Sequence, residues 1–220
     1  MTEDHSIKSH LAILLLAAGA SSRMRGGDKL LEEVDGVPLL RKLAGHACAV
    51  CDVVLVCLRE ADEARRSALS ELDCQTVVVP DAAEGMAHSL RAGIRKLPKR
   101  SSGVMVVLAD MPELTQEDMS VLVQAHLLRP HLIIRASTKE KNAGHPVIFP
   151  QFLFCELKQL AGDIGASSVL KKNASRVRFV ELPERHALTD LDTPDEWIKW
   201  RSKQKARVSS VPKQTLRTKH

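Results

Sequence analysis

Short aliphatic and β-branched runs alternate with helical patterns along nearly the whole 220-residue chain, and this alternation limits the fold more than any other feature. Strands that alternate with helices pack as layers, with a sheet that is largely parallel. The predicted strands cover residues 11–17, 52–58, 76–79, 104–109, 132–136, 146–149 and 177–182. The sequence therefore predicts a layered α/β domain.

Helix-start signals lie between these strands. Pro38 stands at a first helical position, before apolar residues at helical spacing. Thr115 and Asp118 resemble a capping box. Thr193, before Pro194, is an expected N-cap for the last helix. These signals predict helices in the connections between strands.

The charge of the chain is concentrated at its end. The last 20 residues contain seven Lys and Arg and no Asp or Glu, so the first 200 carry a formal charge of −2 although the whole chain carries +5. This segment also has few apolar residues, which is typical of disorder. We expect one folded domain at residues 1–202 and a basic, disordered tail at residues 203–220.

Composition excludes several classes of protein. The chain has only six aromatic residues, too few for the stacking platforms of single-strand nucleic-acid binders, so nucleic acid is not an expected partner. The longest apolar run, residues 11–18, is too short to cross a membrane. The cysteines are odd in number, and Glu3 and Asp4 stand where a secretory signal would be basic. We therefore expect a cytoplasmic protein.

The loop after the first predicted strand is a candidate phosphate site. It runs from Leu16 to Lys29, at the place where α/β sheets bind nucleotides. It lacks Gly-x-Gly-x-x-Gly, and Lys29 follows Asp28 rather than the glycine of a P-loop. Its small residues let backbone amides approach a phosphate, with Arg23 and Lys29 as cations. The alternative is a tight βα turn with two solvated cations.

Further segments occur in a familiar order and spacing. They are LAAG (16–19) with Arg23, Met24 and Lys29, DGVPLL (35–40), EGM (84–86) with Ser89, LADMP (108–112), GHP (144–146), GDIGA (162–166) and DLDTP (190–194). On these motifs the chain resembles the molybdenum cofactor nucleotidyltransferases, and within them the CTP:molybdopterin cytidylyltransferase branch. One residue departs from the common pattern: Arg25 stands where Gly usually follows Arg-Met.

The resemblance implies a three-layer α/β/α sandwich with a mostly parallel, mixed sheet, the Rossmann-like nucleotidyltransferase fold. It implies a magnesium-dependent enzyme that transfers CMP from CTP to molybdenum-bound molybdopterin and releases pyrophosphate. The expected partners are CTP, molybdopterin and the molybdenum enzyme that receives the product.

Carboxylates are needed to hold the magnesium ion, because this hard cation prefers oxygen ligands. Asp110 ends a predicted strand at the carboxyl edge of the sheet and is the first candidate; as an alternative it could cap the next helix, a role that Thr115 already fills. Asp190 and Asp192 alternate around Leu191, so both carboxylates point to one side of an extended segment. Asp192 is the second candidate ligand, and a charged capping turn is the alternative.

The resemblance also assigns the substrate contacts. Arg23, Lys29 and Asp110 are the expected catalytic residues, and Ala18 goes with cytidine where guanylyl-transferring relatives have Gly. The expected nucleotide contacts are Leu16, Ala17, Ala18, Gly19, Arg23, Lys29, Asp81 and Ser89. The expected acceptor contacts are His145, Gly162, Asp163, Gly165, Asp190 and Asp192. Two alternatives stay open: Asp81 as the cap of a turn, and His145 as a structural or surface histidine.

Two other functions stay open at this point. One is a related nucleotidyltransferase that uses GTP, or a sugar or alditol phosphate as acceptor. The other is a non-catalytic carrier or chaperone of the molybdenum cofactor. The presence of Asp110, Lys29 and Arg23 disfavours the carrier, because loss of the metal ligand would be the simplest route to a pure binder.

Overall fold

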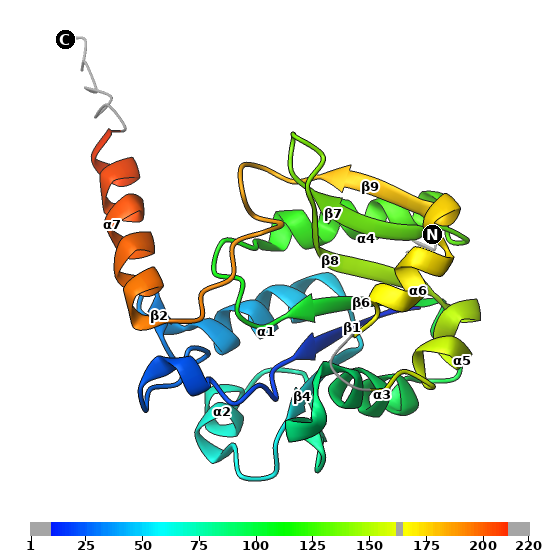
Figure 1. Ribbon diagram of the computed structural model, residues 1–220, viewed down its shortest axis with the longest axis horizontal. Coiled ribbons are helices and arrows are strands. Elements are labelled where there is room, and N and C mark those ends of the chain that lie inside the picture. The colour runs from blue at the N-terminus through cyan, green and yellow to red at the C-terminus, as the bar shows by residue number, and fades with distance from the viewer. Residues whose placement is uncertain (1–9, 162–164, 211–220) are drawn as a thin grey trace, which may run out of the picture.

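A computed structural model describes residues 10–161 and 165–210, and its centre is a seven-stranded sheet (Figure 1). The strands are β1 (Leu11–Leu16), β4 (Val54–Leu58), β5 (Gln75–Val78), β6 (Gly103–Leu108), β7 (Ile133–Ser137), β8 (Ala143–Pro150) and β9 (Val177–Glu181). Each predicted strand overlaps one of them. The fold prediction, a mostly parallel mixed sheet in an α/β nucleotidyltransferase-like fold, is confirmed.

The strand order is β5-β4-β1-β6-β8-β7-β9. Within this sheet, as far as the structure describes the chain, β8 is antiparallel to both β6 and β7, and the other neighbouring strands are parallel. The carboxyl ends of β1 and β6 therefore lie side by side at one edge, and β8 begins at that same edge (Figure 1).

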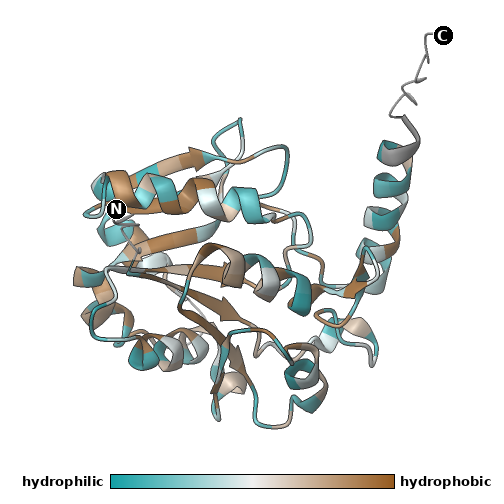
Figure 2. Ribbon diagram, turned by 180° about the vertical axis from the view of Figure 1, so that it is seen from behind, coloured by the Kyte–Doolittle hydropathy of each residue, from teal (hydrophilic) through white to brown (hydrophobic). Residues whose placement is uncertain are grey.

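Helices cover both faces of the sheet. They are α1 (Leu39–Val50), α2 (Glu63–Ala68), α3 (Met86–Lys96), α4 (Gln116–Leu128), α5 (Phe154–Leu157), α6 (Ser167–Lys172) and α7 (Pro194–Ser210). Side chains of β1 alternate between two cores: Ile13 and Leu15 pack with α1 and α4, whereas Leu14 packs with α3 and α5. Figure 2 shows the hydrophobic residues gathered in the strands between the helices.

A small hairpin leads into α1. Strands β2 (Glu33–Val34) and β3 (Val37–Pro38) pair antiparallel across Asp35 and Gly36, which both have positive φ angles, 56° and 77°. This turn suits Asp-Gly, since glycine and aspartate tolerate the left-handed region. The hairpin is missing from the sequence prediction, because two-residue strands leave no alternation to detect.

The predicted helix starts at Thr115 and Thr193 are confirmed by hydrogen bonds. Thr115 Oγ1 accepts from the Asp118 amide and Asp118 returns the bond, so the capping box is present. Thr193 and Glu196 bond each other's amides in the same manner at the start of α7. These bonds satisfy amides that a first helical turn leaves without partners.

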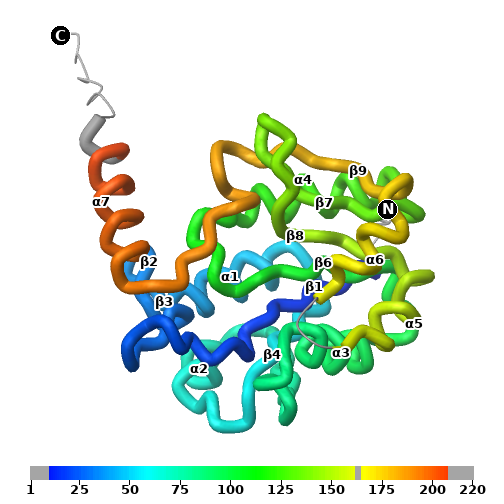
Figure 3. The backbone as a smooth tube through the Cα atoms, viewed as in Figure 1, coloured from blue at the N-terminus to red at the C-terminus, as the bar shows by residue number. Residues whose placement is uncertain are grey.

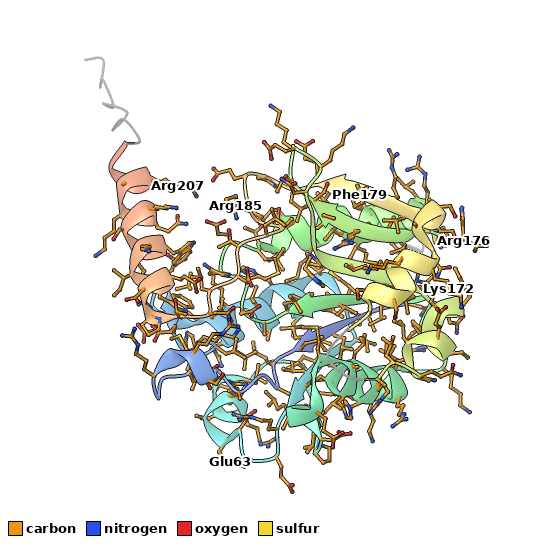
Figure 4. The ribbon with its side chains drawn as sticks, in the orientation of Figure 1. Glu63, Lys172, Arg176, Phe179, Arg185 and Arg207 are labelled. Atoms are coloured by element: carbon orange, nitrogen blue, oxygen red, sulfur yellow. The ribbon has the colours of Figure 1, made fainter. Side chains whose placement is uncertain are left out.

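The last helix is longer than the sequence predicts. The expectation of disorder from residue 203 is wrong for residues 203–210, which continue α7 away from the sheet (Figure 3). Lys, Gln, Ala and Arg are good helix formers, and the side chains of Gln204 and Arg207 contact carboxylates of the body, at Glu113 and Glu184. Figure 4 marks Arg207 on this helix. The division into a domain and a tail otherwise stays a prediction.

Among the described residues, no helix combines the length and the apolar character that crossing a membrane requires.

Candidate active site

A cavity of about 440 Å³ opens at the edge where β1 and β6 end. It is lined by the loop after β1, by the start of α3 and by the segment before α7. The lining residues are Leu16, Ala18, Gly19, Arg23, Lys29, Leu30, Ala82, Gly85, Met86, Ser89, Leu108, Asp110, Asp190 and Asp192. The sequence proposes ten residues as contacts of the nucleotide or the metal ion. Eight of them line this cavity: Leu16, Ala18, Gly19, Arg23, Lys29, Ser89, Asp110 and Asp192.

Two basic and two acidic side chains form a connected network in this cavity. Lys29 Nζ lies 2.5 Å from Asp110 Oδ2 and 2.7 Å from Asp192 Oδ1. Arg23 reaches the other oxygen of Asp192 at 2.8 Å. Lys29 is only 13% exposed, whereas Arg23 is 67% exposed. Lys29 is therefore fixed in the floor of the cavity, and Arg23 reaches it from the solvent side.

The backbone brings the two acidic segments together. The Leu191 amide donates to the Asp110 carbonyl at 3.3 Å, so residues 190–192 run beside the end of β6. Asp190 and Asp192 both line the cavity, as their spacing predicts, while Leu191 is buried in the core. Asp110 does not cap α4, whose N-cap is Thr115.

The charged groups change one another's pKa values. Burial disfavours the Lys29 ammonium, but the carboxylates of Asp110 and Asp192 outweigh this and raise its pKa. The pKa of Asp190 is raised by burial and by the negative charges of Asp110 and Asp192. The cavity thus keeps Lys29 charged. Its lining contains three carboxylates but only two basic side chains, Lys29 and Arg23.

The donor set of this cavity fits a divalent cation. Asp110 Oδ1 is buried and has no hydrogen-bond partner among the described residues, while its other oxygen bonds Lys29. A buried carboxylate oxygen without a partner is costly, and a metal ion would satisfy it. Asp110 and Asp192 are the residues that could hold magnesium here, since carboxylates suit a hard cation.

The loop after β1 holds Arg25 in an unusual backbone conformation. Its φ is 53°, in the left-handed region that favours glycine, and Gly26 follows at 94°. This explains why the related pattern has glycine at the position of Arg25. The Arg25 side chain points to Asp195, at 3.6 Å, rather than into the cavity lining.

Two of the expected nucleotide contacts lie outside the lining. Ala17 is fully buried under the loop. Asp81 is bonded to His88 Nδ1 and lies 3.6 Å from Arg91. The His88 hydrogen bond lowers the pKa of Asp81. Asp81 is therefore paired with side chains of α3.

The expected acceptor contacts are spread more widely. His145 is partly exposed and does not line the cavity, and its pKa falls to about 4 through desolvation and through Arg135, against the opposing effect of Asp110. Gly144 packs against the Ala187 carbonyl so closely that a Cβ would lie 1.9 Å from the oxygen. Gly165 lies near Met86, which lines the cavity. Gly162 and Asp163 lie outside the described residues.

Sequence reasoning missed Arg65, in α2. Its guanidinium is 1% exposed and bonds the Ala17 and Gly19 carbonyls and the Asp28 carboxylate beneath the loop. The only signal in the sequence is an Arg-Arg pair in a short helix, and such pairs are common on surfaces. The role of Arg65 follows only from the tertiary contact between α2 and the loop.

Comparisons with known proteins agree with this geometry. Residues 13–177 match the family model described as the MobA-like NTP transferase domain. The purine catabolism protein PucB of Bacillus subtilis is 32% identical over 54% of this chain and 58% of its own length. A probable molybdenum cofactor guanylyltransferase of Natronomonas pharaonis is 34% identical over 50% of this chain and 54% of its own length. The chain thus spans little more than half of these two curated relatives.

A solved structure is similar over most of its length. Rv0371c from Mycobacterium tuberculosis superposes with a TM-score of 0.76 and 25% identity, over 89% of this chain and 99% of that one. A second structure of that protein is described as a complex with manganese, and matches with a TM-score of 0.71 over 86% of this chain and 96% of that one.

Proposed function

The chain belongs to the MobA-like NTP transferase family, and we propose that it transfers CMP from CTP to molybdenum-bound molybdopterin with release of pyrophosphate. The observation that carries this proposal is the cavity network in which Lys29 and Arg23 meet Asp110 and Asp192. Two cations for phosphates and two carboxylates for a metal ion are what a nucleoside triphosphate requires.

The reaction joins two anions. A terminal phosphate oxygen of the acceptor attacks the α-phosphorus of CTP, the bond from that phosphorus to the bridging oxygen of the β-phosphate breaks, and pyrophosphate leaves with the electron pair. A phosphate is largely ionised at neutral pH, so the step needs no general base from the protein. The main task of the site is to neutralise and orient charge.

Each charged residue has a role in that task. Lys29 and Arg23 contact the β- and γ-phosphates and stabilise the departing pyrophosphate. Asp110 and Asp192 hold magnesium, which neutralises phosphate charge when bound. Binding of a metal-nucleotide complex exchanges the present Lys29–carboxylate contacts for contacts with ion and phosphate. The manganese described for Rv0371c supports a divalent ion in this fold.

The base preference rests on Ala18. This residue lines the cavity and is 4% exposed, so its methyl group occupies space that a glycine would leave free. A narrower cavity favours a one-ring base over a two-ring base. Leu16, Gly19 and Ser89 complete the nucleotide side of the cavity, and Asp190 with His145 belongs to the acceptor side.

A second candidate is transfer of GMP from GTP. It is favoured by the N. pharaonis relative, which is named a probable molybdenum cofactor guanylyltransferase. The two functions share donor chemistry and differ in the base. The recipient molybdenum enzyme and the cytoplasmic location stay predictions from the sequence.

Pyrophosphate release distinguishes the two. It is measured with CTP, GTP, ATP and UTP in turn, with and without molybdenum-loaded molybdopterin. We expect CTP to be preferred at least about 100-fold, the discrimination that a hydrogen-bonded base edge provides. Equal turnover of GTP and CTP would reject the cytidylyl assignment, and no acceptor-dependent release with any nucleotide would reject the reaction.

A matched pair of variants tests whether the Ala18 methyl group causes the base preference. Ala18→Gly should shift the preference towards GTP, because it removes the methyl group from the cavity. Ser22→Gly, in the same loop, exposed and outside the lining, should leave the preference unchanged. If both variants shift the preference between CTP and GTP equally, loop flexibility rather than cavity size determines which base is preferred.

A further inference from the structure

We propose that Arg65 is the positioning residue of the donor loop: it turns loop carbonyls away from the cavity, so that the amides of Ala18 and Ala20 face the phosphates of the nucleotide. This inference deepens the proposed function and rests on it, because it assumes a nucleoside triphosphate in the cavity. It adds a residue of α2, outside the cavity lining, to the parts that make phosphate binding possible.

The guanidinium of Arg65 uses its full hydrogen-bonding capacity on the loop. NH1 donates to the Ala17 carbonyl at 2.5 Å and to the Gly19 carbonyl at 2.8 Å. Nε and NH2 donate to the two oxygens of Asp28 at 2.6 and 2.8 Å, and NH2 also donates to Ser21 Oγ at 3.1 Å. These are five bonds, as many as a guanidinium has N–H groups.

Burial makes this contact specific. Arg65 is 1% exposed, so its charge depends on the partners just named for compensation. Asp28 supplies the opposite charge; burial opposes its ionisation, but the bonds from Arg65 and from the Leu30 amide lower its pKa. The Asp28 side chain is partly exposed, and its charge balances that of Arg65; Asp62, 3.6 Å from the guanidinium, is itself paired with Arg59. Its contribution to the site is therefore geometric.

Peptide geometry carries the effect from Arg65 to the cavity. In a trans peptide the C=O and the following N–H point in opposite directions. Since the carbonyls of Ala17 and Gly19 point to Arg65, the amides of Ala18 and Ala20 point away from it. Ala18 and Gly19 line the cavity on that opposite side. The loop thus presents donors to the cavity while its acceptors are turned inward.

Those amides are available for a ligand. Among the described residues, no hydrogen bond uses the amides of Ala18, Gly19 or Ala20 as donors, although the Ala17 amide bonds the Cys57 carbonyl within the sheet edge. Free amides that face one way, as those of Ala18 and Ala20 do, form an anion site. Asp28 also immediately precedes Lys29, so the same guanidinium fixes the backbone from which the cavity lysine extends.

The test compares Arg65→Lys with Arg66→Lys. Lysine keeps the charge at position 65 but lacks the planar fork that reaches two carbonyls and a carboxylate together. Arg66 is the next residue of α2, and its guanidinium bonds the Glu60 carbonyl and lies near Glu63, away from the loop. Figure 4 marks Glu63 at the start of this helix. The two variants make the same chemical change in one helix.

Calorimetric titration measures the affinity for the nucleoside triphosphate that the wild type binds best and for the matching nucleoside. Arg65→Lys should weaken triphosphate binding about tenfold or more, the effect of losing hydrogen bonds to charged groups. Nucleoside binding should change less than about twofold, because no phosphate is involved. Arg66→Lys should leave both unchanged. Unchanged triphosphate binding in Arg65→Lys, or an equal loss for triphosphate and nucleoside, overturns the proposal.

Hydrogen exchange without nucleotide provides a readout that does not depend on the proposed function. Arg65→Lys should speed exchange of amides in residues 17–28, and Arg66→Lys should not. Unchanged exchange in Arg65→Lys overturns the positioning role. A wild type that binds no nucleoside triphosphate while its loop loosens in Arg65→Lys rejects the proposed function but supports the positioning of the loop. If Arg65→Lys does not fold, Asp28→Asn, which weakens the same contact, replaces it in both measurements.

Discussion

Lys29 Nζ and Asp110 Oδ2 lie 2.5 Å apart although 81 residues separate them in the chain. They meet because β1 and β6 are adjacent parallel strands, and the chain leaves both at the same edge. Asp192 joins them from the segment before α7. The ammonium is thus the counterion of two carboxylates that are also the candidate metal ligands.

The first prediction concerns Asp110. Asp110→Asn should lower pyrophosphate release by about 100-fold or more at saturating nucleotide, because the lost charge acts mainly on the metal-bound transition state. The matched control is Asp35→Asn, a change of the same kind at an exposed carboxylate that bonds Lys42. Wild-type turnover of Asp110→Asn at limiting magnesium would assign Asp110 a structural role only.

The second prediction concerns Lys29. Lys29→Met should weaken CTP binding, since a phosphate contact is lost, yet tighten binding of manganese alone, since the internal counterion of Asp110 and Asp192 is gone. Manganese titration followed by electron paramagnetic resonance measures the second effect. Lys42→Met removes a lysine that pairs with Asp35 on the surface and should change neither affinity. Weaker manganese binding in Lys29→Met would contradict the counterion role.

Arg23 should behave differently from Lys29. Because Arg23 bonds one oxygen of Asp192 from the exposed side, Arg23→Ala should lower CTP affinity with little effect on manganese alone. Both affinities are measured in the same titrations. Unchanged CTP affinity with weakened molybdopterin binding would move Arg23 to the acceptor side.

The fourth prediction is a pH dependence of stability. His126 is 1% exposed, both its ring nitrogens lack partners among the described residues, and burial lowers its pKa. In the native protein the His126 imidazole therefore stays neutral at a pH where the unfolded chain takes up a proton. This contribution to the free energy of unfolding is fully present above the unfolded pKa of about 6.5 and is lost as pH falls below it. His126→Leu should lose less stability than the wild type between pH 7.5 and 5.5 in urea unfolding. The control is His131→Gln, at an exposed histidine, which should keep the pH dependence of the wild type. Equal losses of stability in all three proteins would contradict the assignment to His126.

The last prediction concerns the end of α7. A chain cut after residue 202 loses the contacts of Gln204 with Glu113 and of Arg207 with Glu184, whereas a chain cut after residue 210 keeps them. We expect the shorter chain to lose about 1–2 kcal/mol and a few degrees of melting temperature, because the Arg207–Glu184 pair is exposed whereas Glu113 is nearly buried. Nucleotide turnover should be unchanged in both. Loss of turnover in the shorter chain at low and high salt alike would show that α7 takes part in the site.

The sequence predicted the strands, and the edge position of both the loop after β1 and Asp110, for the same reason. Aliphatic runs reveal buried parallel strands, and residues that follow such strands gather at one edge. Arg65 was missed because its role depends on how far a side chain of α2 reaches under another segment, which no local pattern encodes. The end of α7 was misplaced because composition rich in Lys and Arg suits both a disordered tail and a solvated helix with carboxylates nearby.

The reversed direction of β8 has a consequence for how such a protein can change. Most of the cavity lining comes from residues 16–110, whereas Asp190 and Asp192 come from the chain after that reversal. The turn at residues 138–142 lies outside the strands, and its backbone bonds stay within the turn, so an insertion there disturbs little else. Under the proposed function, lengthening this turn leaves the network of Lys29, Asp110 and Asp192 intact, because none of these residues lies in it. The chain can therefore vary in length at the start of β8 without a change in the charged groups of the cavity.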